Sequence, residues 1–146
     1  MSVLKWAILG MAIATPALAE VTQIKGNGSV AEVMDALEGA VEAAGATVFA
    51  RIDHAAGAAT IGETLNDAEV LIFGNPALGT PAIQQDALAG LYLPLKVLVY
   101  EDGDGQTWLA YEDPAEMMED LSVDQSAEFM GKMQGALKGL TGKAGG

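Results

Sequence analysis

The sequence contains no cysteine, a single histidine, and 7 lysine and arginine residues against 20 aspartates and glutamates. Without cysteine, the chain lacks a thiolate nucleophile, covalent attachment sites for c-type haem and thiolate ligands for an iron–sulfur cluster. The strong excess of negative charge repels nucleic-acid phosphates and anionic lipid headgroups. We therefore expect neither nucleic-acid binding nor peripheral membrane binding.

Long apolar runs are also scarce, and the one at the start of the chain is short. It extends from Trp6 to Ala14, lies between Lys5 and Pro16, and falls short of the roughly 20 residues that a spanning helix needs. Small residues up to Ala19 complete the pattern of a secretory signal peptide, rather than of a membrane anchor. We expect cleavage after Ala19 and a periplasmic or secreted protein, whose formal charge changes from −13 to −14 with the loss of Lys5.

The remainder, residues 20–146, is predicted to form one domain with a hydrophobic core. It contains no evident linker or internal repeat, and its glycine-rich end, residues 142–146, is expected to be a mobile tail. The chain thus has the size and composition of a small exported domain that folds without disulfides.

Four stretches carry signals for helix starts. Ser29 and Glu32 form a capping box before an apolar stripe that runs from Val30 to Val41. Thr80 followed by Pro81, Asp113 followed by Pro114, and Ser122 are the other expected caps. The Ser122 helix is amphipathic, with an apolar stripe of Phe129, Met130, Met133, Leu137 and Leu140. A short, weak helix is expected in the alanine- and glycine-rich residues 55–65.

Five stretches read as strands: residues 21–24, 46–53, 69–73, 95–101 and 106–112. The last two are expected to form a hairpin around residues 102–105, Asp-Gly-Asp-Gly, which indicates a turn rather than a calcium loop. A two- or four-residue loop would place Val97 and Val99 with Trp108 and Ala110 on one face, and Leu98 and Tyr100 with Leu109 and Tyr111 on the other. Because both faces are apolar, either both are covered or one is a subunit interface.

Several short segments together resemble the DUF302 family, a bacterial domain of unknown function. They are Ile52 to Ala56 (IDHAA), Leu71 to Pro76 (LIFGNP), Gly79 to Pro81 (GTP), Leu93 to Lys96 (LPLK) and Tyr111 to Pro114 (YEDP), and the resemblance spans about residues 28–121. It implies an α+β fold, an antiparallel sheet of about five strands with about four or five helices packed on it, and association as a homodimer. The family brings no assigned reaction. After the GTP segment this chain has Ala82 and Ile83, where the family favours methionine.

Polar and turn residues follow two of the apolar strands, and they form our candidate ligand site. Asn75 and Thr80 lie in a glycine-rich segment before a helix start, and His54 follows another strand end. We expect a non-catalytic domain that binds a small molecule, with no resident cofactor, in a crevice formed by His54, Phe73, Gly74, Asn75 and Thr80.

Alternatives for His54 stay open. Its imidazole suits haem or copper ligation, the latter with one of the methionines, or acid–base catalysis in an enzyme, or a purely structural hydrogen bond. No residue is assigned as catalytic, because no serine lies in a nucleophile motif and no partner for His54 is evident.

Overall fold

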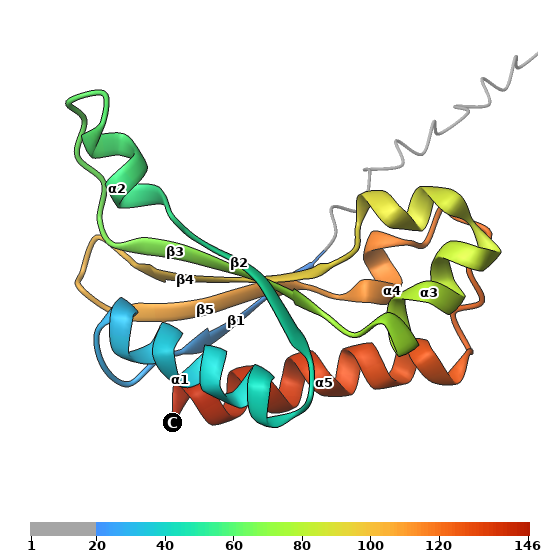
Figure 1. Ribbon diagram of the computed structural model, residues 1–146. Helices are drawn as coiled ribbons and strands as arrows, with labels where there is room; N and C mark the ends of the chain where they lie inside the picture. The colour runs from blue at the N-terminus through green and yellow to red at the C-terminus, as the bar shows by residue number, and fades with distance from the viewer. Residues whose placement is uncertain (1–19) are drawn as a thin grey trace, which may run out of the picture.

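An antiparallel sheet with the strand order β1-β5-β4-β3-β2 lies at the centre of the molecule (Figure 1). The computed structural model describes residues 20–146, and the expected signal peptide, residues 1–19, lies outside them. The strands are β1 (Val21–Lys25), β2 (Thr47–Asp53), β3 (Ala68–Gly74), β4 (Leu95–Glu101) and β5 (Thr107–Glu112).

Five α-helices and one 3-10 helix complete the described residues, which confirms the expected α+β class. Helices α1 and α5 cover one face of the sheet, α2 projects from one end, and α3 and α4 lie at the other (Figure 1). The helices are α1 (Val30–Ala43), α2 (His54–Ala59), α3 (Pro76–Gln85), the 3-10 helix η1 (Ala87–Leu91), α4 (Pro114–Met117) and α5 (Glu128–Gly145).

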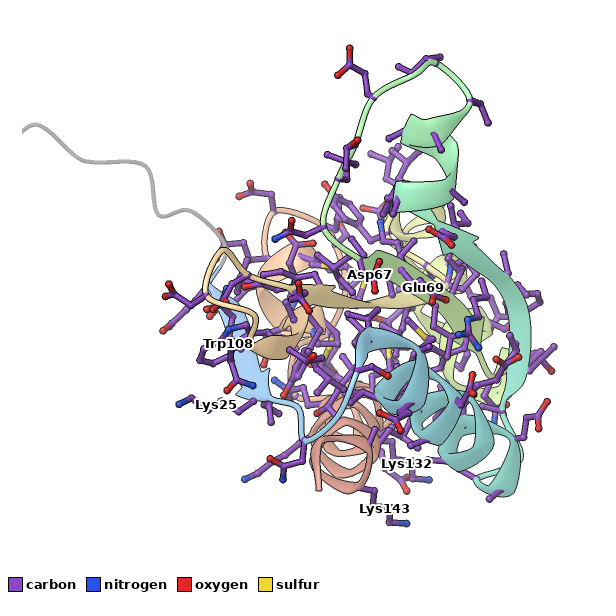
Figure 2. The ribbon with its side chains drawn as sticks, turned by 90° about the vertical axis from the view of Figure 1, so that its left-hand side faces the viewer. Lys25, Asp67, Glu69, Trp108, Lys132 and Lys143 are labelled. Carbon is purple, nitrogen blue, oxygen red and sulfur yellow. The ribbon has the colours of Figure 1, made fainter. Side chains whose placement is uncertain are left out.

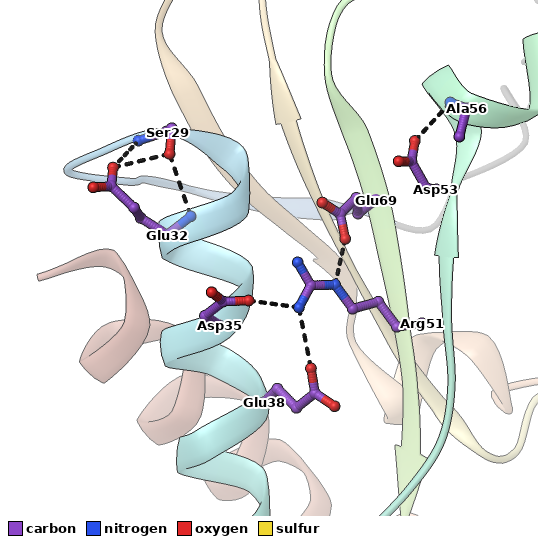
Figure 3. A network of polar contacts seen from close by, with 8 residues as sticks. All are labelled: Ser29, Glu32, Asp35, Glu38, Arg51, Asp53, Ala56 and Glu69. Atoms are coloured by element: carbon purple, nitrogen blue, oxygen red, sulfur yellow. Dashed lines mark hydrogen bonds and ion pairs between the residues drawn. The ribbon is translucent and has the colours of Figure 1, made fainter. Parts of the chain in front are cut away.

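Helix α1 begins with the predicted capping box. The Ser29 backbone N–H donates to Glu32 Oε2 at 2.9 Å, and the Glu32 N–H donates to Ser29 Oγ at 3.3 Å (Figure 3). The hydrogen bond from the Ser29 backbone lowers the pKa of Glu32 below its ordinary value. The apolar stripe of this helix is fully buried against α5 and the sheet, as its spacing predicts.

The β4–β5 hairpin forms as predicted, but its register corrects the expected faces. Val99 pairs with Leu109 and Tyr100 with Trp108, because the loop contains three residues, Gly103 to Gly105, with Gly105 at φ 80°. Compared with a loop of two or four residues, a loop of three shifts the pairing by one residue. Each side chain of β5 therefore lies on the face opposite to the expected one. The helix-covered face therefore contains Val97, Val99 and Leu109, and the opposite face contains Leu98, Tyr100, Trp108 and Ala110.

Asp102 holds this turn through both carboxylate oxygens. Its Oδ2 accepts from Trp108 Nε1 at 2.7 Å, and its Oδ1 accepts from the backbone N–H groups of Asp104 and Gln106, each at 2.9 Å. These bonds, that from Trp108 above all, lower the pKa of Asp102. Lys25 lies over the Trp108 ring, 5.6 Å from its centroid, on the neighbouring strand (Figure 2). The motif Asp-Gly-Asp-Gly thus serves as a turn.

Strand β2 contains a β-bulge at Phe49, where its register with β3 shifts. Val48 pairs with Phe73, but Ala50 pairs with Ile72 and Arg51 with the buried Leu71. One extra residue reverses the sidedness of the rest of the strand. The bulge therefore brings Arg51 to the helix-covered face of the sheet.

Arg51 joins α1 to the sheet through three carboxylates (Figure 3). Its Nη1 lies 2.6 Å from Asp35 Oδ1 and 3.2 Å from Glu38 Oε2, and its Nε donates to Glu69 on β3. The hydrogen bond to Glu69, with those to Asp35 and Glu38, raises the pKa of Arg51. Because the arginine neutralises charge in a strongly acidic chain, it stabilises the packing of α1 on β2 and β3.

Two predicted helix starts are wrong. Helix α3 begins at Pro76 with Asn75 as its cap, so that Thr80 and Pro81 lie inside it. Asn75-Pro76 is itself a cap followed by proline at the first helical position, and it precedes the Thr80-Pro81 signal. Helix α5 begins at Glu128 rather than at Ser122, whose backbone N–H donates to Asp86.

The glycine-rich end, expected as a mobile tail, instead forms the last turn of α5 beside β1. The Asn27 N–H donates to the Gly145 carbonyl at 3.1 Å, and Asn27 Nδ2 donates to the Gly146 oxygen at 3.1 Å. A Cβ at residue 145 would lie 2.8 Å from the Lys25 oxygen. Gly145 is therefore required by a close approach of helix and strand.

This close approach gives a matched pair of variants. We expect Gly145→Ala to lower the free energy of unfolding by about 1–3 kcal/mol, because its methyl group overlaps the Lys25 carbonyl. Gly142→Ala, in open space on the same helix, should be neutral or raise it by up to about 1 kcal/mol. Urea unfolding of residues 20–146 measures both, and equal effects of the two variants would contradict the ordered end.

Candidate functional site

A cavity of about 270 Å³ lies where β3 ends and α3 begins, and we call it the β3–α3 cavity. Its walls come from β2, the β3–α3 junction, the segment before β4 and one residue of α5. The lining residues are Phe49, Gly74, Asn75, Pro76, Leu78, Gly79, Thr80, Ile83, Leu93, Pro94, Leu95 and Met133.

Phe49 forms one wall of the cavity, and the β-bulge puts it there. Its side chain is 56% exposed although it lies in a strand between half-buried neighbours. A Cβ at Gly74 would lie 3.4 Å from the Phe49 ring and 3.4 Å from Pro94 Cβ. Gly74 therefore lies between the two rings, where a methyl group would already be in van der Waals contact with both.

Asn75 and Thr80 supply the polar groups of the cavity. Asn75 Oδ1 accepts from the Ala77 N–H at 2.9 Å and caps α3, which leaves the Nδ2 group of the same amide as a donor. Thr80 lies one turn further along α3, and its hydroxyl group is both donor and acceptor. The cap fixes the Asn75 side chain in place.

The rest of the lining is apolar and uncharged. Met133 from α5 is 1% exposed and lies against the cavity from the core side, while Leu93 and Pro94, joined by a cis peptide bond, form part of the wall. No lysine, arginine, histidine, aspartate or glutamate lines the cavity among residues 20–146. Such a lining suits a small uncharged molecule.

His54 lies elsewhere, so the five predicted site residues do not form one crevice. It follows Asp53, which pairs with Glu69 at the start of β3, whereas Gly74 ends that strand. Five residues at about 3.3 Å each place these two ends about 17 Å apart. Phe73 points into the core and is 2% exposed. The cavity thus brings together Gly74, Asn75 and Thr80.

A second, open hollow of about 310 Å³ contains His54. Its other lining residues include Lys96, Glu112 and apolar side chains of the sheet face that α1 and α5 leave uncovered. His54 is exposed at the first position of α2, a helix that Asp53 caps by accepting the Ala56 N–H at 2.8 Å. The haem, copper and acid–base alternatives concern this hollow, and they stay predictions.

The methionines that were considered as copper ligands lie mostly in the core. Met34, Met118 and Met130 are 0% exposed, and Met133 lines the β3–α3 cavity rather than the hollow of His54. In residues 20–146, no three histidine, cysteine, aspartate or glutamate side chains are grouped so as to hold a metal ion.

Sequence reasoning missed Phe49, the residues before β4 and Met133. The sequence pattern predicts Phe49 as an ordinary residue of an alternating strand, because a β-bulge cannot be recognised from the hydrophobic pattern. The pattern predicts that Met133 belongs to the apolar stripe of its helix, and Met133 is indeed buried in the core. The same side chain also lines the cavity. Leu93-Pro94 was visible only as part of a family motif.

The sequence matches the model of the family described as "Domain of unknown function DUF302" over residues 21–140. The solved structure described as "Crystal structure of uncharacterized conserved protein DUF302 from Bacillus stearothermophilus" has a TM-score of 0.76 and 17% sequence identity. The match covers 85% of this chain and 97% of that chain, and it shows a common fold.

Curated relatives include the fluoride-specific ion channel FluC 1 of Brucella suis biovar 1 and that of Brucella abortus biovar 1. Each is 38% identical over 105 residues, which is 72% of this chain but 41% and 39% of the relative. The chain therefore spans about two fifths of their length. A helix long and apolar enough to cross a membrane is not found in residues 20–146.

The capping role of Asn75 can be tested by measuring the free energy of unfolding of the protein. We expect Asn75→Ala to lower the free energy of unfolding by about 1 kcal/mol, because the Ala77 N–H loses its acceptor. Asn75→Asp keeps an acceptor and places a negative charge at a helix N-terminus, so it should retain the stability at pH 7. Urea unfolding distinguishes them, and an Asp variant as unstable as the Ala variant would contradict the capping role.

Proposed function

Because the chain belongs to the DUF302 family, we propose that it is an exported, non-catalytic domain that binds a small molecule in the β3–α3 cavity. The observation that carries the proposal is the combination in one cavity of apolar walls, no ionisable side chain and two polar groups. Natural binding sites combine apolar walls with a few placed polar groups in this way.

The geometry around the cavity further supports a binding role. A bulge places an aromatic side chain, 56% exposed, at the cavity, although exposure of a large apolar group costs hydrophobic free energy. Gly74 and Gly79 add no side chains of their own to the lining. These features favour a space that a ligand fills.

Export is supported by the residues that precede the domain. Residues 1–19 combine Lys5, a short apolar run and small residues before Glu20, as a signal peptide does. The large negative charge favours solubility after export, and a domain of this size can fold without disulfides.

The Brucella relatives are named as fluoride channels, but we do not extend fluoride binding to this domain. A formal charge of −13 opposes the approach of a small anion, and the β3–α3 cavity offers no cation to offset it. Fluoride accordingly serves as a negative control below.

The ligand site can be tested with a blocking variant and a matched control. Gly79→Leu places a side chain against Leu93, whose Cδ1 lies 3.7 Å from the position of a Cβ at residue 79, and should fill part of the cavity. Gly39→Leu makes the same exchange on α1, where nothing lies within 4 Å. Both gain helix propensity, so a difference between them reports on the cavity.

We expect small neutral organic molecules, screened by thermal shift, to raise the melting temperature of the wild-type protein and of Gly39→Leu. At a concentration a hundredfold above the dissociation constant, the gain corresponds to about 2.7 kcal/mol. Gly79→Leu should lose most of this gain, whereas His54→Ala should keep it and sodium fluoride should give none. Binding that survives Gly79→Leu, or that His54→Ala abolishes, would overturn the proposed site.

We further propose that the domain forms a homodimer through the sheet face opposite to α1 and α5. That face is apolar at Val70, Ile72, Leu98 and Ala110, and its outer residues Val21 and Ile52 are 50% and 43% exposed. An exposed apolar patch of this kind, here bordered by Lys96 and Glu112, supports an interface between subunits.

A charge at the centre of this face should prevent association. We expect the wild-type domain to sediment as a dimer, Leu98→Lys as a monomer, and Leu91→Lys, at a 76% exposed leucine of η1, as a dimer. Analytical ultracentrifugation measures all three, and circular dichroism checks that they fold. A wild-type monomer, or a dimer that retains its affinity in Leu98→Lys, would contradict the interface.

A further inference from the structure

We infer that the ligand of the β3–α3 cavity is a neutral aromatic molecule that carries a hydrogen-bond acceptor. This inference rests on the proposed ligand site and names the chemical class that the site fits. Three features of the cavity support this inference: the absence of charged residues from its lining, the shape of its walls, and the type of polar group that it contains.

The absence of charge in the lining excludes an ionised ligand on energetic grounds. A carboxylate or ammonium group that enters the cavity loses hydration and meets no opposite charge among the lining residues. For an anion, the net charge of the protein adds a further unfavourable contribution. A neutral molecule avoids both costs.

The walls favour a flat ring. Phe49 offers an aromatic face, and the ring of Pro94 lies near it across Gly74, whose lack of a side chain leaves both rings open to the cavity. Aromatic pairs gain free energy beyond their buried area when the rings stack with an offset or meet edge to face. On the core side Met133 adds a polarisable thioether, which makes favourable contacts with the edges of aromatic rings.

The polar groups favour an acceptor on that ring. Asn75 Oδ1 already accepts from the Ala77 N–H, whereas its Nδ2 group is a donor for which residues 20–146 supply no acceptor, and the Thr80 hydroxyl can also donate. A ligand carbonyl or ether oxygen would accept from the Nδ2 group. The cap holds this donor in one position, so binding does not need to order it.

The test uses three probes that share one framework: acetophenone, cyclohexyl methyl ketone and benzoate. The first is neutral and aromatic, the second replaces the aromatic ring with a saturated one, and the third carries a charge. The protein is labelled with ¹³C at its methionine methyl groups, and Met133→Leu assigns the Met133 signal. Met34, Met117, Met118 and Met130 do not line the cavity and serve as internal controls.

We expect acetophenone to shift the Met133 methyl signal by its ring current and to bind about threefold to tenfold more tightly than cyclohexyl methyl ketone. Benzoate should bind at least about tenfold more weakly than acetophenone. Phe49→Leu should remove the preference for the aromatic ketone. Asn75→Asp retains an oxygen at the cap but lacks the Nδ2 donor, so it should weaken the binding of acetophenone about twofold to tenfold. The binding of ethylbenzene, an additional control probe that has the aromatic ring but no hydrogen-bond acceptor, should stay unchanged.

The outcomes separate the two proposals. If the saturated ketone or benzoate binds as tightly as acetophenone and shifts the Met133 signal, the aromatic, neutral class is overturned while the site stands. If none of the three probes moves the Met133 signal at millimolar concentration, both the class and the proposed site fail. A shift that persists in Gly79→Leu would place the probe elsewhere and would likewise overturn the inference.

Discussion

The structure depends on burial of one face of the sheet against α1 and α5. Most of the largest fully buried side chains, among them Phe73, Leu71, Leu37 and Leu109, come from that face and from the helices that cover it. Burial of this apolar surface is the main favourable term in folding. Because side chains alternate along a strand, every strand must present the correct residues to the helices, and a slip of one residue would expose them.

Two local irregularities decide which residues of β2 and β5 face the helices. The three-residue loop of the hairpin places Leu109 rather than Trp108 beside Val99, and the bulge in β2 brings Arg51 to the covered face while Val48 stays there. The bulge also presents Phe49 to the β3–α3 cavity. A single extra residue thus serves the packing of α1, through the carboxylates that Arg51 joins, and the wall of the candidate site.

The cavity and the hollow of His54 lie at opposite ends of the β2–β3 pair. Antiparallel pairing places the end of β2 beside the start of β3, so residues that follow the two strands cannot meet. The uncharged cavity at one end contrasts with the hollow at the other, which contains His54, Lys96 and Glu112. The two hollows of the surface therefore differ in charge as well as in position.

Local signals in the sequence determined helix α1 with its capping box, the existence of all five strands and the cap at Asp113. They also placed Gly74, Asn75 and Thr80 close together, where the structure has them lining one cavity. Such features depend on neighbouring residues, whose spacing and hydrogen bonding can be read along the chain. Tertiary structure alone decided the hairpin register, the bulge at Phe49, the distance of His54 from Asn75 and the docking of Gly145 on β1. Each of these depends on which segments meet in space, and pairing between distant strands leaves no periodic trace in the sequence.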